Sequence, residues 1–187
     1  MMFRNTRTSW GSIAKAFHWG IAALVIFSIA YGWWMAHAAP RAERLSMYTF
    51  HSSIGYDLLF LLVLRLCWRA IDRAPELPQD TQRWERAIAH LGHALLYLLM
   101  LAASIGGWLL LGTFSRRIEG TLFGIVPVPP PVLDRSLHGL LEKSHEFLSY
   151  ALLALVVLHV AAALRHHFIK KNDVLRRMGW GSRARAC

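Results

Sequence analysis

The residues of this sequence best suited to chemistry are its histidines, and two of them enclose the last apolar run. Between His145 and His159, residues 147–158 contain neither a charge nor a proline. Such a run crosses a bilayer only as a helix, because lipid offers backbone groups no partners. The interval of fourteen residues is about 3.9 helical turns and roughly 21 Å of rise. The two imidazoles therefore lie nearly on one face, one near each leaflet, where ionisable groups are costly and usually functional.

Neutral imidazole is an axial ligand of haem iron, so this pair can mark two stacked ligand positions. The alternative is a pair of interfacial histidines hydrogen-bonded to their neighbours. No Cys-x-x-Cys-His motif occurs, which excludes covalent c-type attachment, so any haem is held non-covalently. The two cysteines, Cys67 and Cys187, are far apart in sequence and indicate no disulfide framework.

The composition is that of a membrane protein. The 187 residues are 55% hydrophobic, yet the formal net charge is +10. Apolar helices with basic termini and loops combine these two properties, whereas a soluble globule of this size carries more charge and shorter apolar runs. Neither a nucleic-acid recognition motif nor a nucleotide-binding glycine motif accompanies the basic charge.

We expect an all-α fold, a four-helix transmembrane bundle with two stacked b-type haems, in a single membrane domain. The predicted spans are residues 17–35, 47–68, 87–111 and 145–164, followed by a basic tail over 165–187. Ala36-His37-Ala38 resembles a signal-peptide cleavage site, but the apolar run before it is longer than an h-region of 7–15 residues. Pro75 and Pro78 break the chain before the third span, and the run from Pro127 to Pro131 favours extended polyproline conformation.

The distribution of basic residues predicts the orientation. Fifteen Lys and Arg residues fall on the side of the two termini and six on the other side. The positive-inside rule then places both termini in the cytoplasm of a multi-pass protein of the bacterial inner membrane.

With this topology each histidine acquires a depth. His18 opens the first span and His159 ends the fourth, so both lie near the cytoplasmic leaflet. His51 opens the second span and His145 the fourth, so both lie near the outer leaflet. Each pair draws on two helices, as bis-imidazole ligation of a haem between helices requires. We therefore predict these four residues as the axial ligands of two haem irons.

The chain resembles the bacterial cytochrome b561 family, the stand-alone di-haem kind related to the membrane subunit of nickel–iron hydrogenases. The matching stretches are Phe17-His18-Trp19, His51-Ser-Ser-Ile-Gly55, Arg65-Leu-Cys-Trp-Arg69, Ala89-His-Leu-Gly-His93, Gly107-Trp108-Leu109, Phe123-Gly124, His145-Glu146, Leu158-His159-Val-Ala-Ala-Ala-Leu-Arg-His-His-Phe168 and Val174-Leu-Arg-Arg-Met178. The family's ligands fall at the same four histidines. The resemblance implies electron transfer to or from membrane quinone in a respiratory chain.

One branch of that family is similar to a superoxide oxidase, which passes electrons from periplasmic superoxide to ubiquinone. The resemblance therefore implies either a superoxide:quinone oxidoreductase or a plain electron carrier. The runner-up is a non-redox, histidine-rich membrane protein for metal-ion binding or transport. Few intramembrane carboxylates and the depth pairing of the histidines argue against it. The sequence specifies neither the electron donor, the direction of flow, the haem potentials, the quinone site, the oligomeric state nor a partner redox subunit.

Five further residues lie near the predicted inner haem. His90 and His93 share a helix face and could replace the first-span ligand, bind quinone or contact a propionate, or simply cap the helix. Arg65, Arg165 and His166 lie at the same depth and could pair with anionic propionates, although positive-inside charge explains them equally well.

Other polar and small residues allow two readings each. Asp57 lies about 9 Å deeper than His51 on the second span, where it either relays protons or, as we favour, pairs with a polar neighbour. Lys143 and Arg135 lie near the outer pair, where positive charge would attract an anion such as superoxide. The small positions on the spans are explained by tight helix packing or by room for a porphyrin: Gly20, Gly32, Gly55, Gly106 and Gly107.

Overall fold

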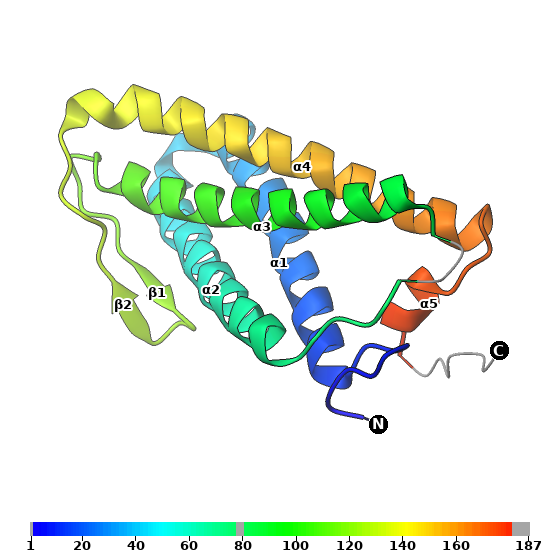
Figure 1. The fold of residues 1–187 in the computed structure, drawn as a ribbon. Helices are drawn as coiled ribbons and strands as arrows, with labels where there is room; N and C mark the ends of the chain where they lie inside the picture. Colours follow the sequence, from blue (N-terminus) through cyan, green and yellow to red (C-terminus); the bar gives the residue numbers. More distant parts are fainter. Residues whose placement is uncertain (1, 78–80, 181–187) are drawn as a thin grey trace.

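The computed structural model describes residues 2–77 and 81–180, over which four long helices, a small hairpin and three short helical segments are formed (Figure 1). The long helices are α1 (Ser12–His37), α2 (Arg44–Ile71), α3 (Arg83–Leu111) and α4 (His138–Phe168). The shorter elements are η1 (Arg41–Glu43), β1 (Gly120–Leu122), β2 (Val126–Val128), η2 (Arg135–Leu137) and α5 (Val174–Met178).

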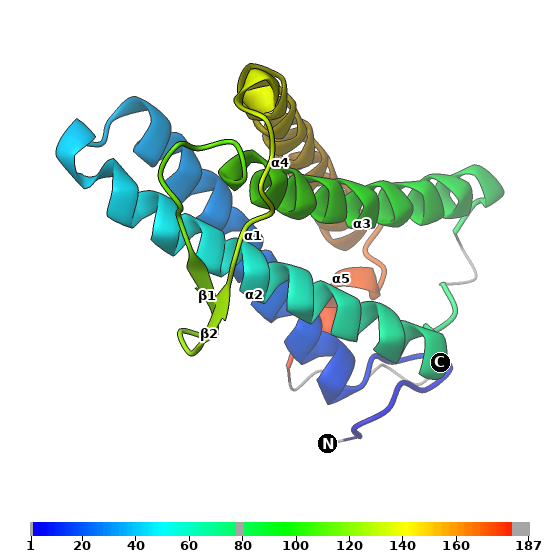
Figure 2. The ribbon, with the colours of Figure 1, turned by 90° about the vertical axis from the view of Figure 1, so that its left-hand side faces the viewer.

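The four long helices contact one another in a closed ring, α1 with α2, α2 with α3, α3 with α4, and α4 with α1. Figures 1 and 2 show that the α3–α4 pair crosses the α1–α2 pair. Leu62 of α2 is fully buried where the helices meet, with Val25 of α1 and Leu152 of α4 in the same apolar cluster. This narrow core fixes the helices that carry the histidines.

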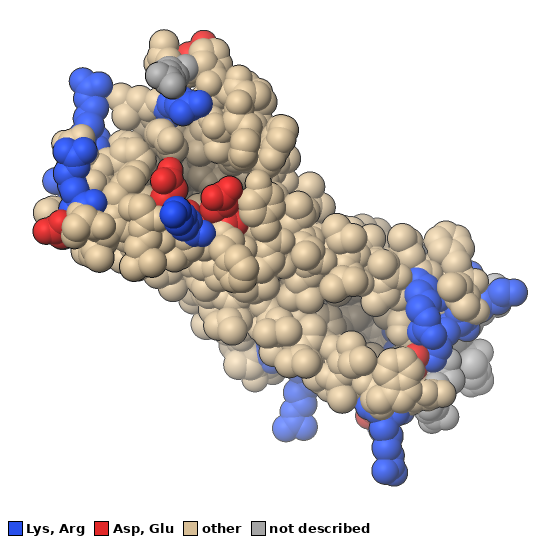
Figure 3. All heavy atoms as spheres, turned by 90° about the horizontal axis from the view of Figure 1, so that it is seen from above, with Lys and Arg blue, Asp and Glu red and all other residues tan. Residues whose placement is uncertain are grey.

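Among the described residues, three helical segments are long and apolar enough to cross a membrane: Ser12–His37, Arg83–Leu111 and Arg135–Phe168. Their outward faces carry large apolar side chains that water would not favour, such as Leu98 on α3 and Leu158 on α4. Most Lys and Arg side chains on the face in Figure 3 gather toward its two ends, with an uncharged surface between them. Both features place the protein in a membrane.

The second predicted span, residues 47–68, is not among these three segments. Polar side chains interrupt the outer half of α2, notably Ser52, Ser53 and Asp57. The four-span prediction is therefore supported for three helices only. The helices also extend beyond the predicted spans. The spans were predicted from runs of apolar residues, whereas a helix continues past such a run into the membrane interface. α4, for example, begins at His138 rather than at residue 145.

The loop between α3 and α4 differs in part from the polyproline conformation predicted for residues 127–131, because residues 127 and 128 belong to strand β2. β1 and β2 pair antiparallel, with Thr121 opposite Pro127. A two-stranded hairpin has two edges, so a strand residue without an N–H is tolerated there. At the other end of the molecule, α4 continues four residues into the predicted basic tail, and residues 181–187 of that tail lie outside the described part, as does Pro78.

Candidate functional site

The histidine pair predicted to lie near the outer leaflet, named the outer pair on that prediction as the other is named the inner pair, joins α2 to α4. The ring centroids of His51 and His145 are 6.2 Å apart, with an angle of 81° between the ring planes. Nδ1 of His145 lies 3.0 Å from the carbonyl oxygen of Ala103 on α3. With the proton on Nδ1, His145 donates to this carbonyl and keeps the lone pair of Nε2 for a metal. Nδ1 of His51 is buried and has no hydrogen-bond partner among the described residues.

Two glycines back the outer pair. A Cβ added at Gly32 of α1 would lie 3.0 Å from Cε1 of His51. A Cβ added at Gly107 of α3 would lie 3.0 Å from Cε1 and 3.3 Å from Nδ1 of His145. Each imidazole thus fills the space of a missing side chain on a neighbouring helix. Of the small positions noted in the sequence, these two touch the histidines, whereas Cβ atoms at Gly20 and Gly55 would meet nothing within 4 Å.

The inner pair joins α1 to α4. The ring centroids of His18 and His159 are also 6.2 Å apart, with 58° between the planes. His93 of α3 joins them, its ring centroid 5.5 Å from that of His159. His90, one turn earlier on α3, is exposed. The inner end therefore brings together three imidazoles, where the outer end has two.

A guanidinium accompanies the inner pair. Nη2 of Arg65 on α2 lies 3.3 Å from Nδ1 of His18, and Nε of Arg65 donates to the hydroxyl of Tyr97 at 2.9 Å. Because a guanidinium only donates, Nδ1 of His18 accepts in this contact and its proton is on Nε2. The guanidiniums of Arg65 and Arg69 lie 5.8 and 6.0 Å from the centre of the Tyr97 ring. Both arginines line an open pocket that Trp68 also borders.

The spacing of both pairs suits one metal ion between the rings. A metal–imidazole bond is about 2 Å long and a ring centre lies about 1 Å behind its nitrogen, so rings on opposite sides of one ion have centroids roughly 6 Å apart. The ring centroids of both histidine pairs are 6.2 Å apart, close to this expected spacing. Within residues 2–77 and 81–180 no group of three or more His, Cys, Asp or Glu side chains could hold a metal ion. Two imidazoles therefore suit a metal that brings its other ligands with it, as haem iron does.

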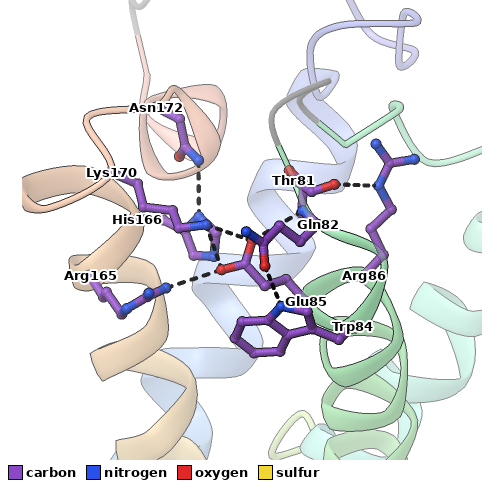
Figure 4. Close-up of polar contacts among 9 residues, drawn as sticks. All are labelled: Thr81, Gln82, Trp84, Glu85, Arg86, Arg165, His166, Lys170 and Asn172. Atoms are coloured by element: carbon purple, nitrogen blue, oxygen red, sulfur yellow. Dashed lines mark hydrogen bonds and ion pairs between the residues drawn. The ribbon is translucent and has the colours of Figure 1, made fainter.

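Arg165 and His166, predicted near the inner haem, belong instead to a polar cluster that joins the end of α4 to the start of α3 (Figure 4). Nη1 of Arg165 lies 3.2 Å from Oε1 of Glu85, and Nζ of Lys170 lies 2.6 Å from Oε2. His166 pairs through Nδ1 with Asn172 at 3.0 Å. Glu85 was not predicted from the sequence. The signal in the sequence was a capping-box spacing, because Glu85 stands three residues after Gln82. The carboxylate of Glu85 accepts a hydrogen bond of 3.2 Å from the backbone N–H of Gln82.

Asp57 has a partner in the loop between α3 and α4. Its Oδ1 accepts a hydrogen bond of 2.7 Å from the backbone N–H of Phe123. At the outer end, Lys143 and Arg135 have exposed side chains. The positive patch over the outer pair stays a prediction, and both of its cations are exposed to solvent.

Comparisons with known proteins show what the chain is similar to. The family model described as prokaryotic cytochrome b561 matches residues 9–181. "Cytochrome b561 homolog 2" of Escherichia coli (strain K12) is 35% identical over 188 residues, covering 95% of each chain. "Probable superoxide oxidase CybB" of Yersinia pestis is 28% identical over 165 residues, covering 86% of this chain and 90% of the relative. "Cytochrome b561 homolog 1" of Escherichia coli (strain K12) is 26% identical over 169 residues, covering 86% and 91%.

Proposed function

Because the chain belongs to the prokaryotic cytochrome b561 family, a family of membrane b-type cytochromes that transfer electrons, we propose that it holds two haems b. His51 and His145 would ligate the outer iron, and His18 and His159 the inner iron. The observation that supports this most strongly is the equal 6.2 Å spacing of the two ring pairs. The 5.5 Å spacing of His93 and His159 is shorter than opposed ligation needs, which favours His18 as the partner of His159.

The outer site is prepared for its ligand role by the backbone around it. The carbonyl of Ala103 orients the ring of His145 and fixes its tautomer. Gly32 and Gly107 give the two rings the room they occupy. Bound haem iron supplies reversible one-electron chemistry, which none of these side chains provides.

The inner site differs in how its ligand is held. Ligation through Nε2 of His18 requires that Arg65 release Nδ1, from which it lies 3.3 Å away. An anionic propionate is a strong alternative partner for a guanidinium. We infer that Arg65 turns from His18 to a propionate when haem binds, and that Arg69, which shares the pocket, adds a second positive charge there.

The proposed reaction is the transfer of electrons from a periplasmic donor such as superoxide to ubiquinone. Two superoxide anions would each lose one electron and leave as O₂, while one quinone gains two electrons and two protons and leaves as quinol. The name of the Yersinia pestis relative supports this choice of donor. The two ligands on α4 are fourteen residues apart, roughly 21 Å along the helix, so the two pairs lie near opposite faces of the membrane.

The test is to count haems in purified variants by pyridine haemochrome and by reduced-minus-oxidised visible spectra. His51→Ala and His145→Ala should each remove the outer haem and spare most of the inner one. His159→Ala should do the reverse. His37→Ala is the matched control, because His37 is exposed and contacts Trp33, one turn earlier on its own helix: Nδ1 lies 2.9 Å from the carbonyl oxygen and the two rings stack. Two full haems in His159→Ala would contradict the assignment.

The orientation is tested separately. A green fluorescent protein fused after Cys187 should fluoresce, and alkaline phosphatase inserted at Ser115 should be active, if both termini are cytoplasmic. Active phosphatase at the C-terminus instead would exchange the outer and inner labels of the two sites without altering the ligand pairs.

A further inference from the structure

The loop between α3 and α4 contains a stretch whose composition is unlike that of an aqueous loop. Residues 120–133 include no Lys, Arg, Asp or Glu, although Glu119 and Asp134 flank them directly. Within this stretch lies the hairpin of β1 and β2, whose turn exposes apolar side chains. Phe123 is 51% exposed, Ile125 80% and Val126 54%. Exposure of three neighbouring large apolar side chains indicates a partner surface rather than water.

The hairpin reaches the depth at which the helices cross the membrane. β1 packs along α2, and Figures 1 and 2 both show the hairpin beside that helix. At its tip, the ring of Phe123 packs edge-on against Phe60 of α2, with centroids 5.3 Å apart. Leu58, two residues before Phe60, shares a buried cluster with Val25, which is in the middle of the candidate span Ser12–His37. The tip of the hairpin is therefore level with the middle of a membrane-crossing helix.

Non-helical backbone at this depth needs its polar groups satisfied, because lipid has none to offer. The N–H of Thr121 donates to Oγ of Ser53 at 2.9 Å, and the N–H of Phe123 donates to Oδ1 of Asp57 at 2.7 Å. The N–H of Ile125 donates to the carbonyl of Leu122 at 3.1 Å. Four of the fourteen residues, at positions 127 and 129–131, are prolines, which have no N–H to leave unpaired.

The same contacts account for the polar side chains of α2. Ser53 and Asp57 interrupt the apolar surface of this helix, which is not one of the three segments apolar enough to cross a membrane alone. In the structure both side chains accept hydrogen bonds from the hairpin, which lies over them. A helix covered in this way presents the apolar turn of the hairpin outward in place of its own hydroxyl and carboxylate groups.

We propose that the β1–β2 hairpin is embedded in the hydrocarbon region of the membrane, where it covers the polar face of α2 and presents Phe123, Ile125 and Val126 to lipid. α2 and the hairpin together then form the fourth membrane-crossing unit. Asp57 is the residue that anchors the turn. This inference rests on the membrane location of the protein and not on the haem assignment.

Nitroxide spin labels on single cysteines test the location of the turn. The background is the Cys67→Ser, Cys187→Ser protein in phosphatidylethanolamine–phosphatidylglycerol liposomes. Labels are placed at Ile125→Cys in the hairpin turn, at Val157→Cys on α4, and at Ser115→Cys in the loop after α3. Val157 is 58% exposed, and Ser115 is exposed. Each label is relaxed by oxygen, which concentrates in lipid, and by a water-soluble nickel chelate.

We expect the ratio of oxygen to chelate relaxation at Ile125 to be at least as high as that at Val157, which lies nearer the inner leaflet, and to exceed that at Ser115 several-fold. A chelate-dominated signal at Ile125, with Val157 still oxygen-dominated, would overturn the proposal. So would a label at Ile125 that neither reagent reaches, because protein rather than lipid would then cover the turn. A chelate-dominated signal at both sites would overturn the membrane placement of α4 as well, whereas haem counts in the histidine variants are independent of every arm.

Paired substitutions at Asp57 test the anchor. Asp57→Asn keeps a carbonyl oxygen that can accept from the N–H of Phe123, whereas Asp57→Leu removes the acceptor. We expect the label at Ile125 to become more mobile and more accessible to the chelate in Asp57→Leu and to remain unchanged in Asp57→Asn. Ser53→Ala removes the second acceptor and should produce a smaller change of the same kind. Unaltered label mobility in both Asp57→Leu and Ser53→Ala would refute the anchoring role.

Discussion

Replacing Gly107 by alanine tests the outer site with the smallest available perturbation. The added Cβ would lie 3.0 Å from Cε1 of His145 and 3.3 Å from Nδ1. Ordinary carbon contacts begin near 3.5 Å, so the ring must move by roughly 0.5 Å. Metal–ligand distances hold to about ±0.2 Å. A ring displaced by more than that tolerance is a poorer ligand, and the bond from Nδ1 to the carbonyl of Ala103 is disturbed with it.

The adjacent glycine is a matched control. A Cβ at Gly106 would meet only Cδ1 of Leu148, at 4.0 Å. Both substitutions exchange glycine for alanine inside α3, so both gain up to about 1 kcal/mol in helix propensity. That gain cancels in the comparison. Any difference between Gly107→Ala and Gly106→Ala therefore reports the contact with the imidazole.

The assay is haem content by pyridine haemochrome together with a redox titration of the purified variants. We expect Gly106→Ala to keep two haems, and Gly107→Ala to lose part of the outer haem or shift the midpoint potential of one of the two. Gly32→Ala should act in the same direction, because its Cβ would press on Cε1 of His51. Full haem content and an unchanged titration in both Gly107→Ala and Gly32→Ala would show that the outer pair is not a tightly held ligand site.

Three further outcomes follow from single contacts. Arg65→Gln should weaken haem retention at the inner site, and Arg65→Lys should restore it in part, as measured by haemochrome counts, because a propionate needs a cation but is held best by a guanidinium. Glu85→Gln should lower the melting temperature in detergent without changing haem content, since it removes the buried partner of two cations. Arg7→Gln, which breaks the exposed ion pair of Arg7 with Glu76, should lower the melting temperature less. Lys143→Glu should slow reduction of the haem by superoxide at low salt, because it replaces a positive charge that attracts the anion. The rate of the wild-type protein should fall with added salt, because the Debye length shortens from about 30 Å at 0.01 M to about 10 Å at 0.1 M.

Which histidines lie together could be predicted from the sequence, because the prediction depends only on which end of an apolar run each residue occupies; their depth in the membrane stays a prediction. His18 and His159, from the first and last helices, do lie 6.2 Å apart. Their role as ligands stays a prediction. The lateral direction of a side chain is a different matter, since it depends on which helix packs beside it. Arg165 has the right depth for the inner pair, yet it faces Glu85 at the start of α3.

The hairpin illustrates a second limit of the sequence. Its strands are three residues long and one contains a proline, so no alternation of polar and apolar residues is available to predict them. The hairpin is stabilised by α2, where the side chains of Ser53 and Asp57 accept hydrogen bonds from backbone N–H groups of the hairpin. Those two residues are 68 and 66 positions away from their partners. From neighbouring residues alone, the sequence therefore predicts only an apolar, proline-rich loop, and the carboxylate of Asp57 in α2 has no evident partner.

The two ends of the molecule differ in a way that bears on their roles. At the outer end, a backbone carbonyl and two glycines hold the rings of His51 and His145, and none of these elements can change its charge or length. At the inner end, the contact to His18 comes from Arg65, a long side chain that also bonds Tyr97 and lines an open pocket. A backbone carbonyl and two glycines hold one ring geometry, whereas a guanidinium on a long side chain can turn from an imidazole to an anionic or carbonyl oxygen. We therefore predict that a quinone, as the electron partner proposed above, meets the chain at the inner end, where the third imidazole, that of His93, also lies.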